Sequence, residues 1–366
     1  MNIIRKLMRI MDSVLKHRWN NMDSTIKMSH STPAADSGLQ ARSAMKINTL
    51  ATLVKEAAQR ITPYILHTPL LFTPALSQDT GVNIHLKLEN EQITGSFKAR
   101  GAFNTVGVLA AEGVTTVYIA STGNHGLACV PACRTFNVAC QVVVPVTADL
   151  EKKEKLRANG ANLREHGTDC SETEAFTRRL AKEHGSPYLS PYNEYLIMAG
   201  QGTVGREILL DLPEVDAIFV AVGGGGLISG VAAYVKSHRP TCKVVGCSPA
   251  RSKVMHESVR AGRIIQEDSE ETLSDGTAGG LEEGALTFPL CRDLVDDWIL
   301  VDEEEIAQAV YYCLKQHRKV VEGASGVALA AVKKAKAQYQ GQQVAVVMCG
   351  ANISMKNLQT IIQNYA

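Results

Sequence analysis

A lysine among small residues is the first candidate for chemistry. Lys98 closes the segment 94–98, Thr-Gly-Ser-Phe-Lys, whose glycine and serine predict a turn that enters a helix. A lysine in such a place can contact a phosphate or, when it is removed from water, act as a neutral amine nucleophile. Most lysines are solvated surface charges, so Lys98 alone does not identify a site.

A second candidate is the turn 121–126, Ser-Thr-Gly-Asn-His-Gly, which directly follows a run of β-branched residues. A glycine-rich turn that feeds a helix exposes backbone N–H groups and the positive end of the helix dipole, and both suit an anion such as a carboxylate. An ordinary helix cap fits the same residue types. His125 can equally be a packing histidine.

Four consecutive glycines form the third candidate. Gly223, Gly224, Gly225 and Gly226 separate an apolar run at 217–222 from a helical pattern at 227–238. Several N–H groups of such a turn can surround one phosphate with no side chain in the way. The spacing fits neither the GxxxxGK pattern of nucleoside triphosphate sites nor the dinucleotide pattern GxGxxG. A phosphate is therefore indicated, but not one of ATP or NAD.

The fourth candidate is a thiol at the end of the last strand-like run. Cys349 begins the segment 349–352, Cys-Gly-Ala-Asn. A thiol there can be a nucleophile, a weak hydrogen-bond donor or a small buried apolar group, and the last is the default for a single cysteine.

The elements that must position these residues alternate along the chain. Short apolar runs predict buried strands of a parallel sheet, and amphipathic stretches between them predict helices. The pattern indicates an α/β protein, in which ligands bind at the carboxyl ends of strands. The predicted strands are 115–120, 140–146, 217–222, 243–247 and 344–348, and the predicted helices are 150–158, 171–184, 227–238, 303–317 and 325–339.

Composition excludes several classes of protein. The 366 residues allow about two domains. With 38 Lys and Arg against 37 Asp and Glu, the net charge of +1 gives no reason to expect a nucleic-acid partner. No run of 18 apolar residues predicts a membrane span. The nine cysteines form no CxxC pair, which favours reduced thiols inside a cell and a cytoplasmic location.

The first 45 residues differ from the rest of the chain. Residues 1–46 hold eight Lys or Arg and three acidic residues, which leaves 30 basic and 34 acidic residues, a net charge of −4, for the remainder. Apolar residues recur at helical spacing within the first 15 positions. A basic amphipathic start is typical of a mitochondrial transit peptide, and a disordered extension is the favoured alternative.

The segments TGSFKARGA, STGNHG, VGGGG and CGAN, in this order, resemble the motifs of the fold type II family of pyridoxal-phosphate enzymes, especially its serine/threonine dehydratase and serine racemase branch. The resemblance covers about residues 46–355, and the segments 190–193 and 199–203 are similar to that branch as well. It implies a tryptophan synthase β-like fold with two domains, whose open, mostly parallel sheets carry helices on both faces. The large domain would comprise 46–110 and 191–366, and the smaller one 111–190. A homodimer is implied too.

The resemblance also implies roles for individual residues. Lys98 would hold pyridoxal 5'-phosphate covalently, with Phe97 beside it. The other expected cofactor contacts are Asn124 at the phenolic oxygen, Gly223, Gly224, Gly225, Gly226 and Leu227 around the phosphate, and Cys349 at the ring nitrogen. Ser121, Thr122, Gly123 and His125 would bind the carboxylate of an amino-acid substrate.

The implied activity is a lyase that converts L-threonine, L-serine or a related β-hydroxy amino acid to a 2-oxo acid and ammonia. A thiol at the ring nitrogen does not favour protonation of the ring, which suits elimination. The alternatives are a serine or aspartate racemase and a catalytically inert homologue that binds the cofactor. Racemases of this branch have a serine as second acid/base where this chain has Thr122, whose extra methyl restricts its rotamers.

A metal site found in several members of the branch needs carboxylates after the strand at 243–247. This chain has Arg251 and Lys253 there. A hard cation requires oxygen ligands, so the sequence predicts no metal of that kind.

Overall fold

The computed structural model describes residues 34–365. The chain divides into two compact units, Met1–Ala44 and Met45–Ala366, and the description below concerns the second. Helix α2 (Ala34–Ile61) begins within the range predicted as an extension. The amphipathic pattern of the first 15 positions, and with it the transit-peptide alternative, lies outside the described residues.

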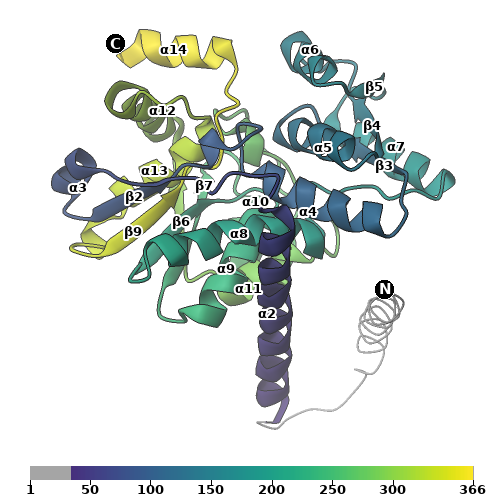
Figure 1. Ribbon diagram of the computed structural model, residues 1–366. Helices are drawn as coiled ribbons and strands as arrows, with labels where there is room; N and C mark the ends of the chain where they lie inside the picture. The colour runs from purple at the N-terminus through teal and green to yellow at the C-terminus, as the bar shows by residue number, and fades with distance from the viewer. Residues whose placement is uncertain (1–33, 366) are drawn as a thin grey trace. The chain divides into compact units, whose positions relative to one another are not determined.

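A six-stranded sheet forms the larger layer (Figure 1). Its strand order is β1-β2-β9-β6-β7-β8, and all neighbours are parallel except β1 and β2. The strands are β1 (Leu70–Phe72), β2 (Asn83–Lys87), β6 (Ala217–Ala221), β7 (Lys243–Pro249), β8 (Asp297–Val301) and β9 (Gln343–Val347).

Helices cover both faces of this sheet, because each parallel connection crosses over one face. Helix α13 packs on β6, β7, β8 and β9, while α9 packs on β6 and β7 and is itself covered by α8 (Figure 1). The helices outside the second sheet are α3 (Pro74–Thr80), α4 (Lys98–Ala111), α8 (Tyr195–Asp211), α9 (Gly226–His238), α10 (Val254–Ala261), α11 (Thr287–Leu294), α12 (Glu303–Tyr312), α13 (Gly323–Lys334) and α14 (Met355–Tyr365).

The second sheet is smaller and wholly parallel. It consists of β3 (Thr116–Ala120), β4 (Ala139–Val144) and β5 (Asn162–Glu165), in that order. Its helices are α5 (Asn124–Thr135), α6 (Leu150–Ala158) and α7 (Cys170–Glu183). All six elements lie within residues 111–190, the range predicted for a smaller domain.

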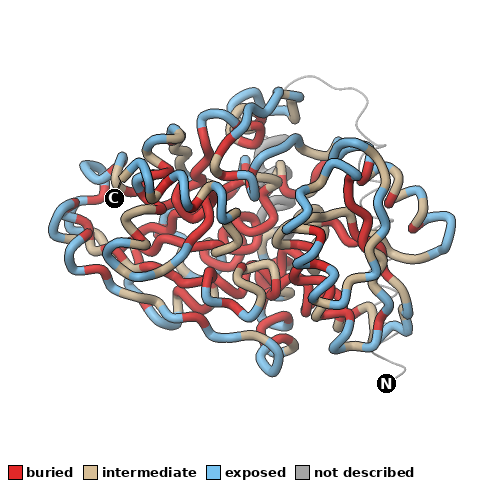
Figure 2. Tube along the Cα trace, turned by 90° about the horizontal axis from the view of Figure 1, so that it is seen from above, coloured by how far each residue is buried: buried red, intermediate tan, exposed pale blue. Residues whose placement is uncertain are grey.

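Each sheet has its own hydrophobic core, and Figure 2 shows buried segments running through both. The larger core includes the strands β6, β7 and β9 with α9 and α13. The smaller core takes its residues from β3, β4, α5 and α4. Four residues of α4 therefore belong to the core of the second sheet, although the resemblance implied that they lie in the large domain: Ala99, Ala102, Phe103 and Val106.

The α/β class predicted from the sequence is confirmed, with all five predicted strands present at shifts of one or two residues. Four strands escaped prediction. Strand β5 is polar and largely exposed at the edge of its sheet, and β1, Leu-Leu-Phe, has only three residues, too few for an apolar run to predict a strand. The helix predicted over 303–317 stops at Tyr312, and residues 313–317 continue as a π-helical turn.

Within the described part of the chain, no helix combines the length and the apolar character that crossing a membrane requires. All nine cysteines are free thiols.

Candidate active site

Lys98 is the first residue of α4 and is half-buried. Its Nζ donates a 2.7 Å hydrogen bond to the carbonyl oxygen of Pro191. Burial lowers the pKa of Lys98 to about 8, although Cys129, Cys349 and Glu322 act in the opposite direction. The side chain therefore has a larger neutral amine fraction near neutral pH than a surface lysine has.

Backbone pairing places the segment around Lys98 against the segment that begins with Cys349. Phe97 N donates to Cys349 O at 3.0 Å, and Ala351 N donates to Gly95 O at 2.8 Å. Gly95 has φ +71°, which allows the chain to turn there before α4 begins. Two of the predicted site segments are thus immediate neighbours, although about 250 residues separate them along the chain.

The turn 121–126 connects β3 to α5. Ser121 Oγ holds it in shape by accepting hydrogen bonds from the N–H groups of Gly123 at 3.3 Å and Gly126 at 3.2 Å. Among the residues that the structure describes, the N–H groups of Thr122, Asn124 and His125 donate to no protein acceptor. Three free donors at a helix N-terminus are suited to a carboxylate.

The His125 side chain, however, is occupied elsewhere. Its Nε2 lies 3.0 Å from the carbonyl oxygen of Leu189, and the ring is buried. Burial, together with the nearby Lys98 charge, lowers the pKa of His125 to about 3. The imidazole is therefore neutral and packs against the backbone, which leaves only its main-chain N–H for an anion.

The four glycines lie between β6 and α9. Gly225 has φ +85°, and a Cβ on Gly224 would lie 2.5 Å from the ring of Tyr192. In the described structure, no hydrogen bond links the N–H group of Gly223, Gly224, Gly225 or Gly226 to another protein atom. Free donors on a backbone that tolerates no side chain are what a phosphate needs. The predicted Leu227 follows them as a buried residue of the first turn of α9.

One short segment, 189–192, contacts three of the predicted motifs. Leu189 O bonds His125, Pro191 O accepts from Lys98, and the Tyr192 ring lies against Gly224. The structure thus brings together the lysine, the carboxylate-type turn and the phosphate-type turn.

Cys349 is buried at the end of β9. Its Sγ lies 3.6 Å from Ser325 Oγ and 3.8 Å from Glu322 Oε1. Burial raises the pKa of the Cys349 thiol, and the neighbouring Glu322 carboxylate raises it further. The thiol is therefore neutral, and it is a poor candidate for a nucleophile.

Glu322 is a site residue that the sequence reasoning missed. Both of its carboxylate oxygens lie 2.9 Å from Asn124 Nδ2, and Oε2 accepts from Asn352 N at 3.1 Å. Burial raises the pKa of the Glu322 carboxyl, and the hydrogen bonds from Asn124 and Asn352 oppose the rise. Its only signal in the sequence is an acidic residue directly before the small residues 323–326 that open α13.

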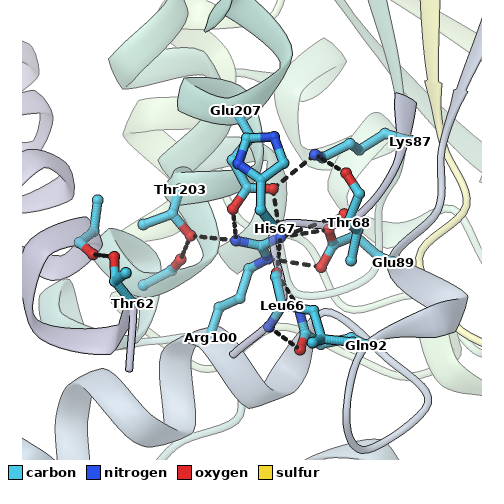
Figure 3. A network of polar contacts seen from close by, with 12 residues as sticks. Thr62, Leu66, His67, Thr68, Lys87, Glu89, Gln92, Arg100, Thr203 and Glu207 are labelled. Atoms are coloured by element: carbon cyan, nitrogen blue, oxygen red, sulfur yellow. Dashed lines mark hydrogen bonds and ion pairs between the residues drawn. The ribbon is translucent and has the colours of Figure 1, made fainter. Parts of the chain in front are cut away.

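A buried network of charged side chains includes Arg100, in the first turn of α4. Figure 3 shows the Arg100 guanidinium between two carboxylates, Glu89 of the 3₁₀ helix η1 (Glu89–Glu91) and Glu207 of α8. Arg100 Nε lies 2.7 Å from Glu89 Oε2, and Lys87 Nζ lies 2.6 Å from Glu207 Oε2. Because Arg100 follows Lys98 by two residues, this network also fixes the first turn of α4.

The amine of Lys98 suits covalent attachment of an aldehyde, and the glycine turn suits a phosphate, so the site has the chemistry of an enzyme that uses a phosphorylated aldehyde cofactor. The chain belongs to the pyridoxal-phosphate dependent enzyme family, whose profile matches residues 61–350. The family predicted from the motifs is thus confirmed.

Individual relatives match most of the chain. It is 39% identical to the L-threonine ammonia-lyase of Thermotoga maritima, over 84% of this chain and 77% of the relative. It is 34% identical to the L-threo-3-hydroxyaspartate ammonia-lyase of Saccharomyces cerevisiae, over 84% and 95%. The structure of maize serine racemase is similar with a TM-score of 0.80 and 31% identity, over 86% and 97%.

The described residues fit pyridoxal phosphate. The free N–H groups of the glycine turn provide donors for a dianionic phosphate. The hydroxyl of Ser96, two residues before Lys98, is buried with no hydrogen-bond partner within the described chain, so the site contains a polar group that a ligand can satisfy. The Lys98 amine, with its lowered pKa, is suited to covalent attachment of an aldehyde.

Proposed function

We propose that this protein is a pyridoxal-phosphate-dependent lyase acting on L-threonine, L-serine or a related β-hydroxy amino acid. The β-hydroxyl leaves as water, and hydrolysis of the resulting unsaturated amine then releases a 2-oxo acid and ammonia. The names of the two ammonia-lyase relatives support this reaction. The carrying observation is the convergence of segment 189–192 on Lys98, His125 and the glycine turn.

In this proposal the chain holds the cofactor through five kinds of contact. Bound pyridoxal phosphate supplies a conjugated ring that takes up the negative charge left when the substrate loses its α-hydrogen. The residues assigned to it are Lys98 for covalent attachment, Phe97 beside it, Asn124 at the phenolic oxygen, Gly223, Gly224, Gly225, Gly226 and Leu227 at the phosphate, and Cys349 at the ring nitrogen. The neutral Cys349 thiol carries no negative charge that would favour protonation of that nitrogen when the cofactor is bound.

The substrate carboxylate is assigned to the turn 121–126. The free N–H groups of Thr122, Asn124 and His125 supply the donors, and Ser121 and Gly123 hold the turn. These donors are fixed before the substrate arrives, so little reorganisation is needed on binding.

Lys98 Nζ is assigned as the base. Once the substrate amino group has taken its place, the released amine accepts the α-proton, and its lowered pKa favours the unprotonated form that this requires. Because the amine remains attached to α4 next to the reacting carbon, proximity contributes much of the rate.

The test is incubation of the purified protein with L-threonine and L-serine, with assays for 2-oxo acid and ammonia and chiral analysis of the remaining amino acid. Release of both products supports the lyase. D-Serine without pyruvate would instead establish the second candidate, a racemase, for which the similarity to maize serine racemase speaks. Bound cofactor with no turnover of any hydroxy amino acid would indicate the inert homologue.

Replacement of the base tests its assignment. In Lys98→Ala we expect the visible absorbance of lysine-bound cofactor and the activity to disappear, because no other amine is assigned to that position. A variant that keeps both would refute the assignment of Lys98. We extend the proposal to a cytoplasmic homodimer, with 46–110 and 191–366 as the large domain and 111–190 as the small one.

A further inference from the structure

A chain of hydrogen bonds runs from a surface lysine into the site. Lys155 Nζ on α6 donates to Asn352 Oδ1 at 2.6 Å, and Asn352 Nδ2 donates to Asn124 Oδ1, also at 2.6 Å. Asn124 Nδ2 then donates to both oxygens of Glu322 at 2.9 Å. Every donor points the same way, from the ammonium group to the carboxylate.

The two ends of this chain determine the orientation of both amides. An ammonium group can only donate. Burial favours the neutral form of Glu322, but both of its oxygens accept hydrogen bonds, from Asn124 Nδ2, Asn352 N and Cys349 Sγ, and these contacts fit a carboxylate, which can only accept. Asn352 must therefore turn its oxygen to Lys155, and Asn124 must turn its nitrogen to Glu322. Asn352 Nδ2 also donates to Thr94 O at 3.2 Å, which holds its amide in the same orientation.

Glu322 contacts two of the residues assigned to the cofactor ring. It bonds Asn124, assigned to the phenolic oxygen, and its Oε1 is 3.8 Å from Cys349 Sγ, assigned to the ring nitrogen. The residue is 4% exposed, and a Cβ on Gly350 would lie 2.5 Å from Oε1, so the backbone lies close against the carboxylate. Three uncharged groups hydrogen-bond the carboxylate, those of Asn124, Asn352 and Cys349. The charged groups that interact with it are Lys98 and Asp275.

We propose that Glu322 is a positioning residue which, with Asn352 and Lys155, fixes the Asn124 amide in one orientation. The two Glu322 oxygens share one hydrogen of Asn124 Nδ2, and the other hydrogen is left for the phenolic oxygen of the cofactor. This inference rests on the cofactor contacts of the proposed function. It adds a negative charge to the site that none of the predicted motifs contains.

The first test is Glu322→Gln in the holoenzyme. A glutamine has nearly the same size, but its own amide can donate to Asn124 Oδ1, so the orientation of Asn124 is no longer fixed and the charge is gone. We expect the pH at which the visible absorbance of lysine-bound cofactor changes to fall by about one unit, because a nearby positive charge loses an anion. Glu112→Gln, on an exposed residue at the end of α4, is the matched control.

Lys155→Met tests the chain without disturbing the core, because Lys155 is exposed. We expect the dissociation constant for pyridoxal phosphate to rise about two- to tenfold in Lys155→Met and in Glu322→Gln, which is the range for loss of one hydrogen bond. The double variant is expected to be weaker by less than the product of the two factors, since the residues act through the same amides. Lys182→Met, on an exposed residue of α7, is the control.

A purely structural role for Glu322 predicts another result. It would lower the unfolding temperature of Glu322→Gln and leave the absorbance titration and the cofactor affinity at the values of the control variants, and that outcome overturns the proposal. None of these measurements uses a substrate. If the variants show the expected changes in absorbance titration and cofactor affinity, but the protein turns over no hydroxy amino acid, the proposed reaction is refuted and the role of Glu322 is retained.

Discussion

Arg100 and Glu207 pair through two hydrogen bonds in the interior, from Nη1 to Oε1 at 2.6 Å and from Nη2 to Oε2 at 2.8 Å. Their side chains are 0% and 8% exposed. A buried charge is tolerated only when it is paired and hydrogen-bonded. The pair joins α4 to α8, and it therefore ties the first turn of α4, where Lys98 lies, to a helix 107 residues further along the chain.

We expect Arg100→Met to lower the free energy of unfolding by about 3–5 kcal/mol, because Glu89 and Glu207 are left buried without their main cation. Denaturant titration of the variant and the wild type measures the loss. Arg134→Met, on an exposed arginine of α5, is the control. If the two variants lose the same stability, the network contributes nothing particular.

The glycine turn can be tested with two glycines of similar backbone conformation. Gly225 and Gly113 have φ +85° and +88°, but a Cβ on Gly225 would lie 2.8 Å from Met255 Cε, whereas nothing lies within 4 Å at Gly113. We expect Gly113→Ala to cost about 1–2 kcal/mol from backbone strain alone and to leave cofactor affinity unchanged.

Gly225→Ala is expected to cost more and to weaken cofactor binding about tenfold or more, because the N–H groups that hold the phosphate are displaced. Thermal unfolding of the apoprotein and titration with pyridoxal phosphate separate the two effects. Equal cofactor affinity in Gly225→Ala and Gly113→Ala would contradict the assignment of the turn to the phosphate.

The sequence predicted those parts of the site whose chemistry is local. Lys98, the turn around Gly123 and the four glycines each lie next to the helix that uses them, so a short segment carries the whole signal. Glu322 and Arg100 escaped because their meaning depends on partners far along the chain: Asn124 is 198 residues from Glu322, and Glu207 is 107 residues from Arg100. A single sequence holds no information about such pairs.

The same distinction applies to the fold. Strand β6 has five buried residues and was predicted almost to the residue, because an apolar run between turns is a local signal. Strand β5, with the sequence Asn-Leu-Arg-Glu, is a strand only because β4 pairs with it. Likewise, α4 packs on α5 and joins the smaller core through contacts that its own sequence does not specify.

His125 predicts an acid sensitivity. Its folded pKa of about 3 lies below the value of about 6.5 for an unfolded histidine, so the unfolded chain binds the extra proton first. The free energy of unfolding should fall by about 1.4 kcal/mol per pH unit from this group as the pH drops from about 6.5 toward 3, and should not change above about 6.5.

In His125→Gln this contribution is absent, and glutamine can still donate to Leu189 O. Denaturant titrations between pH 7 and 4 are expected to show a shallower loss of stability in the variant. His184→Gln, on an exposed histidine after α7, should keep the wild-type slope. Parallel curves for His125→Gln and the wild type would show that the ring is not buried in the neutral form.

Removal of divalent cations is expected to leave activity unchanged. In the segment after β7 the Arg251 guanidinium donates to Glu271 O at 3.1 Å and lies 3.9 Å from Glu270 Oε2. The positive charge of Arg251 therefore interacts with the oxygens that a metal ion would need there. The measurement is turnover after treatment with a chelator, with and without added Mg²⁺ or Ca²⁺. Loss of turnover that either ion restores would contradict the prediction.

Thr122 determines how far the protein can act as a racemase. In the part of the chain that the structure describes, no residue hydrogen-bonds the Thr122 hydroxyl, so its position is limited chiefly by the rotamers that the methyl group permits. Thr122→Ser removes that methyl and keeps the hydroxyl. We expect the ratio of D-serine to pyruvate formed from L-serine to rise about three- to tenfold, which corresponds to the cost of an off-rotamer side chain.

Chiral chromatography with a 2-oxo acid assay measures both products, and Thr135→Ser on the exposed end of α5 is the control. An unchanged ratio would mean that the Thr122 hydroxyl already reaches the substrate as freely as a serine would, or that it takes no part in proton transfer; either result removes the rotamer argument against racemisation.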